Sequence, residues 1–343
     1  MTRVAIVGCG LIGAKRARAL TEARLVVACD VDRGRAERLA AEHASCRAVV
    51  DPREAVAADD VDVVIVATIN DALAETTQLA LSAGKHVLVE KPAARPNDDL
   101  LALITLARTA KRVVKVGFNH RFHPGAQKMR AIVDAGELGE LMFLRARYGH
   151  GGRLGYEREW RADPQRAGGG ELLDQGVHLI DLARWFLGDV AEVSGHVGTF
   201  FWDMPVEDNA FLVLRTREER VALLHASCSE WKNMFSLELY GRDGKLQLDG
   251  LGGSYGVEKL THYRMLPQMG PPETETWEYP GEDVSWREEW RHFLGCIEGR
   301  EQPLGDLGDA HAALEVVRRA YALPGRRSRP IDRRKPPSPE GHS

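Results

Sequence analysis

The stretch VAIVGCGLIG, residues 4–13, decides the fold of this chain. It joins a short β-branched run to a glycine-rich turn and then to a helical pattern, which is how a βαβ unit begins. Gly8 permits a tight turn, Gly10 lets backbone approach a pyrophosphate, and Gly13 lets the helix pack on the strand. The helix N-terminus offers free N–H groups to phosphates. The predicted phosphate-binding residues are Gly8, Gly10, Leu11, Ile12 and Gly13.

An acidic residue, Asp30, ends the next apolar run, 22 residues after Gly8. A carboxylate there accepts hydrogen bonds from ribose hydroxyls and repels a 2′-phosphate, so we predict NAD in preference to NADP. Arg33 and Arg35 follow, and we interpret them as a solvated helix face. The alternative for the whole pattern is a tight turn in an α/β protein that binds no dinucleotide.

Strand-like and helix-like patterns alternate through the first 120 residues, which predicts an α/β Rossmann domain with a doubly wound parallel sheet. Later strand-like runs adjoin one another, which predicts an α+β domain with a large, mostly antiparallel sheet. The predicted strands are residues 4–7, 25–29, 63–67, 86–89, 113–116, 142–149, 211–216, 221–228, 235–240 and 246–248. The predicted helices are residues 13–22, 33–43, 74–83, 98–110 (with Asn97 as its N-cap), 123–135, 172–187, 286–298 and 310–323. We predict domains at 1–120 and 121–323, and a loosely held tail at 324–343.

Composition and charge narrow the class of protein. With 343 residues, 44% of them apolar and 28% charged, the chain is expected to be globular with two domains. A net charge of -4 gives no reason to expect nucleic acid or an anionic membrane as partner. No apolar run approaches the ~20 residues of a membrane span, and a strand begins too early for a signal peptide. Five scattered cysteines suggest reduced thiols, so we predict a cytoplasmic protein.

The motif Glu90-Lys91-Pro92 follows a predicted strand. Ligands of open α/β sheets bind at that edge, and Pro92 disfavours helical geometry for Lys91. The Lys91 ammonium can donate to a substrate oxygen or lower the pKa of a neighbouring acid. The alternative is an ordinary surface turn.

Asp174 and His178 lie four residues apart, just after three consecutive glycines at 168–170. In a helix both would project from one face, where His178 can accept a proton and Asp174 can orient its ring or hold a substrate hydroxyl. Gly176 between them suggests close approach of another group to that face. The alternative is a capping aspartate and a core histidine.

A metal site is not predicted. Asp181 extends the set of Asp174 and His178, but no third strong ligand follows at metal-site spacing. We interpret His120 and His123 as parts of a solvated loop.

These motifs resemble those of the glucose–fructose oxidoreductase, inositol dehydrogenase and rhizopine catabolism (Gfo/Idh/MocA) family. The matching segments are residues 8–13, Asp30, residues 90–92, GFNHRF at 117–122, Trp160-Arg161 and GGGELLDQGVH at 168–178. The resemblance, over residues 1 to about 323, implies a Rossmann domain and a substrate-binding second domain that mediates homodimers or homotetramers. It implies that Lys91, Asp174 and His178 occupy catalytic positions, with Asn119 and Arg121 near the substrate or nicotinamide. The family's Thr-Pro-Asn loop is replaced by Thr68-Ile69-Asn70, which puts the local loop shape in doubt.

The predicted function is NAD-dependent oxidation, or the reverse reduction, of a secondary hydroxyl on a sugar, sugar phosphate, nucleotide sugar or cyclitol. His178 would take the hydroxyl proton with help from Asp174, Lys91 would stabilise the alkoxide, and hydride would pass to nicotinamide C4. The formal base, Lys91 or His178, stays unassigned. The predicted cofactor residues also include Thr68, Asn70, Glu90 and Lys91. The predicted substrate residues are Lys91, Asn119, Arg121, Tyr148, Trp160, Arg161, Asp174 and His178.

The loop at residues 148–166 is expected to shape specificity. Tyr156 and Trp160 offer faces for a sugar ring. The arginines that can meet a phosphate or carboxylate are Arg153, Arg158, Arg161 and Arg166. They suggest a phosphorylated or nucleotide-linked sugar, and the equal alternative is ordinary solvated arginine.

Two other functions remain open. One is a redox-neutral NAD-dependent glycoside hydrolase, which oxidises a sugar transiently, eliminates the aglycone and releases no net NADH. The other is a non-catalytic NAD-binding regulator, which has no need of Lys91, Asp174 and His178 together.

Overall fold

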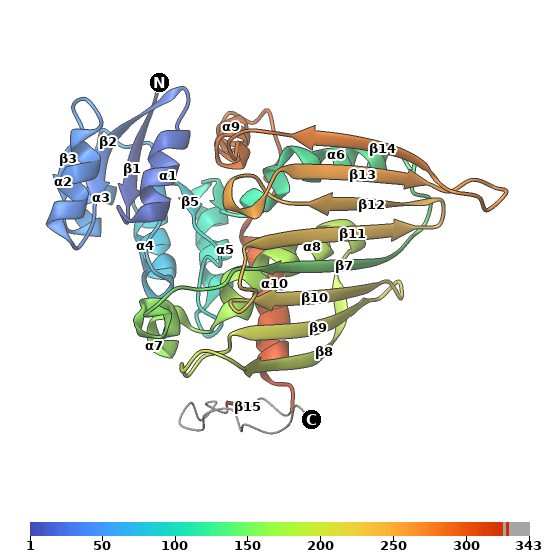
Figure 1. The fold of residues 1–343 in the computed structure, drawn as a ribbon. Helices are drawn as coiled ribbons and strands as arrows, with labels where there is room; N and C mark the ends of the chain where they lie inside the picture. Colours follow the sequence, from blue (N-terminus) through green and yellow to red (C-terminus); the bar gives the residue numbers. More distant parts are fainter. Residues whose placement is uncertain (325–326, 329–343) are drawn as a thin grey trace.

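A six-stranded parallel sheet forms the N-terminal part of the computed structural model, which describes residues 1–324 and 327–328 (Figure 1). Its strands are β1 (Thr2–Val7), β2 (Ala23–Cys29), β3 (Arg47–Val49), β4 (Val63–Val66), β5 (His86–Val89) and β6 (Val114–Val116). Its helices are α1 (Leu11–Ala19), α2 (Arg33–Ala41), α3 (Pro52–Ala57), α4 (Asn70–Ser82) and α5 (Leu100–Ala110). The strand order β3-β2-β1-β4-β5-β6 confirms the predicted doubly wound sheet, and it reverses between β1 and β4, where a ligand crevice is expected.

Both faces of this sheet are buried, as its near-continuous apolar strands require. Successive residues of β1 enter opposite cores: Ala5 and Val7 pack towards α3, α4 and α5, whereas Val4 and Ile6 pack towards α1 and α2. The alternation fixes the register of β1, because a one-residue slip would exchange the two faces.

Some local predictions differ from the structure. The short elements β3 and α3 were not predicted, because three and six residues carry too little periodic signal. Helix α4 begins four residues earlier than predicted, at Asn70. The N-cap of α5 is Asp99, whose side chain accepts a hydrogen bond from Ala102 N, and not Asn97.

A nine-stranded sheet forms the second part, in the order β14-β13-β12-β11-β7-β10-β9-β8-β15 (Figure 1). Its strands are β7 (Leu141–Gly149), β8 (Val190–Thr199), β9 (Asn209–Thr216), β10 (Val221–Ser227), β11 (Met234–Gly241), β12 (Gly244–Asp249), β13 (Glu258–Arg264), β14 (Glu273–Tyr279) and β15 (Arg327–Ser328). The remaining α-helices are α6 (Pro124–Asp134), α7 (Pro164–Ala167), α8 (Val177–Leu187), α9 (Ser285–Ile297) and α10 (Leu307–Tyr321). Among the described strand pairs of this second sheet, only β7–β10 and β8–β15 are parallel, so the prediction of a mostly antiparallel sheet is confirmed.

Helices cover one face of the large sheet. Helix α6 packs on β12, β13 and β14, α8 packs on β7 and β10, and α10 packs on β8. Figure 1 shows these helices behind the sheet, and no helix of the described residues lies in front of it. The uncovered face carries exposed apolar side chains, namely Phe211, Val213 and Leu223.

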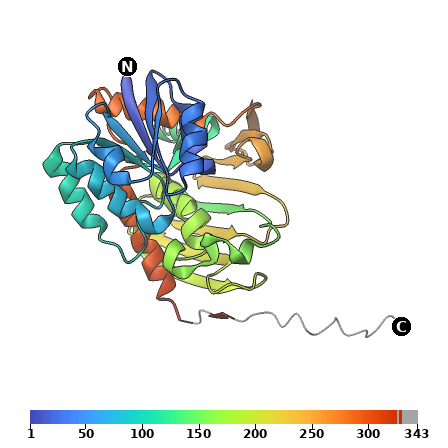
Figure 2. The same cartoon turned by 90° about the vertical axis from the view of Figure 1, so that its left-hand side faces the viewer.

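Helix α9 lies in the sequence range predicted for the second domain, yet it packs on the parallel sheet. Trp290 and Phe293 share a core with Val4 and Ile6, and Trp290 Nε1 donates to the carbonyl of Thr21 at 2.9 Å. Figure 2 views the molecule from the side on which the parallel sheet lies. A division of the chain at residue 120 therefore does not separate two independent cores.

Among residues 1–324 and 327–328, no helix combines the length and apolar character that a membrane span requires. The prediction of a loosely held tail at 324–343 falls, apart from residues 324 and 327–328, outside the described residues.

Candidate active site

A cavity of about 1510 Å³ lies at the carboxyl ends of β1, β4 and β5, where the parallel sheet faces the second domain. Of the predicted cofactor residues, those that line it are Gly8, Gly10, Leu11, Ile12, Asp30, Thr68, Asn70, Glu90 and Lys91. Of the predicted substrate residues, those that line it are Lys91, Asn119, Tyr148, Trp160, Arg161, Asp174 and His178. The structure therefore brings residues from both domains to one site.

The glycine loop has the shape that a dinucleotide requires. Gly8 has φ +99°, and a Cβ added to Gly13 would lie 1.9 Å from the Gly8 carbonyl oxygen, so the helix can approach the strand only because that side chain is absent. A Cβ on Gly10 would meet no atom within 4 Å, so this residue borders open space. No side chain caps α1 at Gly10, which leaves its first N–H groups free for phosphate oxygens. The loop thus fits a pyrophosphate.

Asp30 lies at the end of β2, where it also supports the loop. Its Oδ2 accepts a hydrogen bond from Cys9 N at 2.8 Å, and its Oδ1 accepts one from Asp32 N at 2.9 Å. Each carboxylate oxygen has a further lone pair, so Asp30 can still accept from ribose hydroxyls.

Glu90 is occupied by an ion pair beneath the cavity. Its Oε1 accepts from Arg16 Nε at 2.6 Å, and Arg16 in turn donates to Glu289 of α9 at 2.5 Å. All three side chains are buried. The network fixes the end of β5 and hence the backbone that carries Lys91.

Lys91 and Asp174 are joined directly. The Lys91 ammonium donates to the backbone carbonyl of Asp174 at 2.7 Å and forms an ion pair with Asp174 Oδ1. The other carboxylate oxygen accepts from Arg161 Nε at 3.0 Å. Burial alone would raise the pKa of Asp174, but the two cations hold it well below its usual value. Asp174 therefore stays ionised and anchors the ammonium at the cavity wall.

Asp174 does not orient His178, which was one of the two roles that the sequence suggested for it. No hydrogen bond joins the two side chains in the described part of the chain, although both lie in one continuous helical segment, a π-helical turn at Leu172–Gly176 followed by α8. The Asp174 carboxylate instead meets Lys91 and Arg161. The group that closely approaches Gly176 belongs to the protein itself, because an added Cβ would lie 3.2 Å from Ala226 Cβ on β10.

His178 packs against other rings. Its ring stacks on that of His120 with centroids 3.9 Å apart, and Phe118 contacts it edge-on. Burial lowers the pKa of His178 well below its usual value, and the positive charge of Lys91 lowers it further. His178 is therefore an uncharged imidazole that can accept a proton.

Two residues of the GFNHRF segment, and His123 directly after it, differ from expectation. His120 and His123 are buried, not part of a solvated loop, and His123 Nδ1 lies 3.0 Å from Glu258 Oε2. Arg121 does not line the cavity. Its guanidinium is buried between Asp181 and Asp309, at 2.6 and 3.2 Å, so it ties the 3₁₀ turn at Asn119–Phe122 to α8 and α10. A short basic segment offers no local signal for such distant acidic partners.

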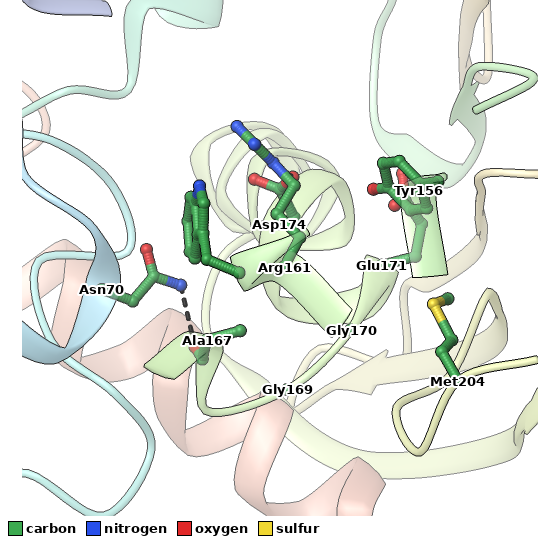
Figure 3. Close-up of a pocket in the computed structure, with 10 residues that line it drawn as sticks. Asn70, Tyr156, Arg161, Ala167, Gly169, Gly170, Glu171, Asp174 and Met204 are labelled. Atoms are coloured by element: carbon green, nitrogen blue, oxygen red, sulfur yellow. Dashed lines mark hydrogen bonds and ion pairs between the residues drawn. The ribbon is translucent and has the colours of Figure 1, made fainter. Parts of the chain in front are cut away.

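A narrow pocket opens beside Asp174 (Figure 3). Asn70 borders it from α4, with its amide donating to the Ala167 carbonyl at 2.9 Å, which is how the altered Thr68-Ile69-Asn70 loop contacts the second domain. Glu171, which the sequence analysis missed, also borders it. Burial, aided by repulsion from Asp174, raises the pKa of Glu171 well above its usual value, so this carboxyl is uncharged. In the sequence, only its position three residues before Asp174 indicated that Glu171 could lie at the site.

The predicted arginine cluster is largely neutralised by acidic partners. Arg153 pairs with Glu159 at 2.7 Å, and Arg161 pairs with Asp174. Arg158 is 81% exposed and does not line the cavity. Of this group, Arg166 is the lining arginine that forms no ion pair with an acidic side chain within the described residues. Phosphate would find few free cations here.

The C-terminal segment supplies further lining residues that the sequence did not reveal. Trp286 lies under the guanidinium of Arg16, 4.4 Å from its ring centroid, and its Nε1 donates to Asp283 Oδ2 at 2.8 Å. Tyr255 lines the cavity from the loop between β12 and β13. Their sequence distance from the glycine loop explains why no motif included them.

Comparison with known proteins agrees with this arrangement. Residues 2–118 match a family described as oxidoreductases with an NAD-binding Rossmann fold, and residues 126–247 match the Gfo/Idh/MocA C-terminal domain. Inositol 2-dehydrogenase 2 of Saccharopolyspora erythraea is 31% identical over 81% of this chain and 76% of its own length. The NAD(+)-dependent scyllo-inositol 2-dehydrogenase of Bacillus subtilis is 26% identical over 92% of this chain and 91% of its own.

The fold also matches solved structures. A levoglucosan dehydrogenase in complex with NADH and levoglucosan superposes with a TM-score of 0.84, at 21% identity, over 93% of this chain and 97% of its own.

Proposed function

The chain belongs to the Gfo/Idh/MocA family of NAD(P)-dependent oxidoreductases that act on CH–OH groups, and from this premise we propose that it is an NAD-dependent dehydrogenase of a secondary hydroxyl on an uncharged cyclitol or sugar. The observation that carries the proposal is the meeting of Lys91 with Asp174 at a cavity that the glycine loop also lines. A binding protein without chemistry has no need of a partly buried ammonium held at the wall of that cavity.

The dinucleotide would be held by the glycine loop, the N-terminus of α1 and Asp30. When bound, NAD supplies the hydride acceptor at its nicotinamide ring. Asp30 supports NAD over NADP, since its carboxylate lies where a 2′-phosphate would approach.

Residues of both domains would handle the hydroxyl proton of the substrate. The Lys91 ammonium donates to the substrate oxygen and stabilises negative charge that develops there. The uncharged His178 imidazole accepts the hydroxyl proton. Asp174 acts through Lys91, which it holds charged and in place, and not through His178.

An uncharged substrate is favoured over a sugar phosphate. Arg153 and Arg161 already pair with Glu159 and Asp174, so binding a phosphate dianion would require breaking an existing ion pair or relying on Arg166. The curated relatives named above are inositol dehydrogenases, which supports a cyclitol as the first compound to test.

We further propose a homodimer or homotetramer in the cytoplasm. The uncovered face of the large sheet carries Phe211, Val213 and Leu223 side by side on β9 and β10, with more than a third of each side chain exposed. Apolar side chains grouped in this way favour association. The five cysteines are free thiols, as expected in a reducing compartment.

The test is a spectrophotometric screen of inositols, sugars and their phosphates with NAD. Appearance of NADH with an uncharged cyclitol or sugar supports the dehydrogenase. Release of free sugar from a glycoside without net NADH identifies the redox-neutral hydrolase instead. Binding of NAD with no turnover of any compound leaves the regulator.

A further inference from the structure

His120 and His178 form a stacked pair of imidazoles inside the protein. Their ring centroids lie 3.9 Å apart at an interplanar angle of 28°, and both side chains are about 95% buried. Two buried imidazolium rings at this distance would repel each other strongly, so the pair is stable with both rings uncharged. The chemistry assigned above to Lys91, Asp174 and His178 gives His120 no part, yet it contacts His178 more closely than any other ring does.

The orientation of His120 is fixed from the start of α9. Asp283 is an acceptor, so Ser285 Oγ donates to its Oδ1 at 2.5 Å and must itself accept from Asn119 Nδ2, at 2.8 Å. The Asn119 amide oxygen consequently points at His120 Nδ1, at 3.3 Å. His120 Nδ1 therefore carries the proton, and the ring is held as one uncharged tautomer.

The groups around His178 all oppose a positive charge there. Lys91 approaches from the end of β5, Arg16 from α1, and His123 from the same turn as His120. The aromatic rings of Phe118 and Tyr148 complete the surroundings. No carboxylate in the described residues hydrogen-bonds to the His178 ring, and its Nδ1 is buried without a partner.

We propose that His120 is a positioning residue for His178: its ring covers one face of the His178 ring, keeps water from it, and so maintains His178 as an uncharged acceptor at the cavity wall. The proposal deepens the proposed function and rests on it, because His178 matters only if a hydroxyl proton is transferred there. Its physical consequence is that His178 remains available as an acceptor at lower pH than a hydrated histidine would.

The experiment follows the titration of His178 by NMR in the full-length protein labelled at histidine Cε1 and saturated with NAD. His178→Gln identifies the His178 signal by its loss. In the wild type this signal should stay that of a neutral ring well below the usual midpoint of about 6.5. In His120→Ala water reaches the exposed face, so the midpoint should rise by about one pH unit or more. In His120→Phe an uncharged ring still covers the face, and the midpoint should stay at its wild-type value.

A His178 midpoint that is unchanged in His120→Ala, or that rises equally in His120→Phe, overturns the proposal. If His120→Ala does not fold, Ser285→Ala gives the same test, because it removes the hydroxyl that orients Asn119 and thereby releases the His120 ring. An unchanged midpoint in Ser285→Ala is then the contrary result. None of these measurements needs turnover, so failure to find a substrate in the screen does not affect them.

With a substrate in hand, the acid limb of the pH profile of kcat/KM gives the second readout. It should move to higher pH in His120→Ala and keep its position in His120→Phe. A loss of rate at every pH with an unmoved limb shows a purely structural role.

Discussion

Lys91 and Asp174 form an ion pair that joins the two domains at the cavity. The lysine follows β5 of the parallel sheet, and the aspartate lies in the π-helical turn before α8. In the proposed mechanism, the substrate oxygen and the dinucleotide both approach this pair. The first prediction tests the lysine directly.

Lys91→Ala should lower kcat by about 10²–10⁴-fold, because the ammonium stabilises charge that develops on the substrate oxygen. The dissociation constant of NAD should change little, since the glycine loop and Asp30 are untouched. Initial rates and a fluorescence titration with NAD measure the two quantities. Lys259→Ala, an exposed position on β13, is the matched control. Wild-type turnover in Lys91→Ala would show that the lysine has been misassigned.

Asp30→Asn should weaken discrimination against NADP. The amide oxygen can still accept from Cys9 N, while the charge that repels a 2′-phosphate is gone. We expect the ratio of kcat/KM for NAD to that for NADP to fall about tenfold, equivalent to about 1.4 kcal/mol. An unchanged ratio would mean that Asp30 only supports the loop.

Glu171→Gln should change how stability depends on pH. Burial raises the pKa of Glu171, so the folded protein keeps this proton over a pH range in which the unfolded chain, with a pKa of about 4.3, has lost it. The folded state then binds more protons than the unfolded state, and this group's contribution to stability falls as pH rises through that range. Glutamine does not ionise, so the variant does not lose stability in this way. The free energy of unfolding of Glu171→Gln, relative to that of the wild type, should therefore increase from pH 5 to pH 8.

Urea unfolding at several pH values measures this difference, and Glu218→Gln, at an exposed position, is the control. Curves for Glu171→Gln and the wild type that stay parallel across the range would show that the carboxyl ionises normally.

Leu223→Glu should dissociate the predicted oligomer, because it places a charge in the apolar group on the uncovered sheet face. Light scattering during size-exclusion chromatography measures the mass. Leu101→Glu, on the exposed side of α5, changes a similarly exposed leucine away from the large sheet and should leave the mass unaltered. A wild-type mass for Leu223→Glu would show that the subunit interface does not include this part of the sheet.

An uncharged cyclitol should be a better substrate than its monophosphate. Because Arg153 and Arg161 are already paired, we expect kcat/KM for the phosphate ester to be at least about tenfold lower, or about 1.4 kcal/mol. Parallel assays of myo-inositol and its monophosphate with NAD decide this point. A preference for the ester would show that the arginines bind the phosphate.

The parts of the fold that could be predicted are those with local signals. Gly8, Gly13 and the two-sided apolar strands encode the parallel sheet within a few residues, and the structure has that sheet. The strand pattern after residue 190 likewise indicated the antiparallel sheet. In contrast, β3 and α3 are too short to show a period, and the packing of α9 on the first domain depends on contacts such as Arg16–Glu289, which are 273 residues apart.

The same distinction holds for the site. The motifs indicated which residues line the cavity, but not which side chains meet. Asp174 and His178 are four residues apart, yet the Asp174 carboxylate contacts Lys91 and Arg161 and not His178. The burial of His120, the uncharged state of Glu171 and the pairing of Arg121 with Asp181 all arise from tertiary contacts, which a linear pattern does not contain.

The attachment of α9 to the parallel sheet has a consequence for biosynthesis. Arg16 is made among the first residues of the chain, but its partner Glu289 leaves the ribosome 273 residues later. Until then a guanidinium destined for the interior lacks one of its two carboxylates, and the apolar surface later covered by Trp290 stays open to water. The nascent Rossmann half therefore lacks part of its core until α9 has been synthesised, and residues 1–120 expressed by themselves should be prone to aggregate.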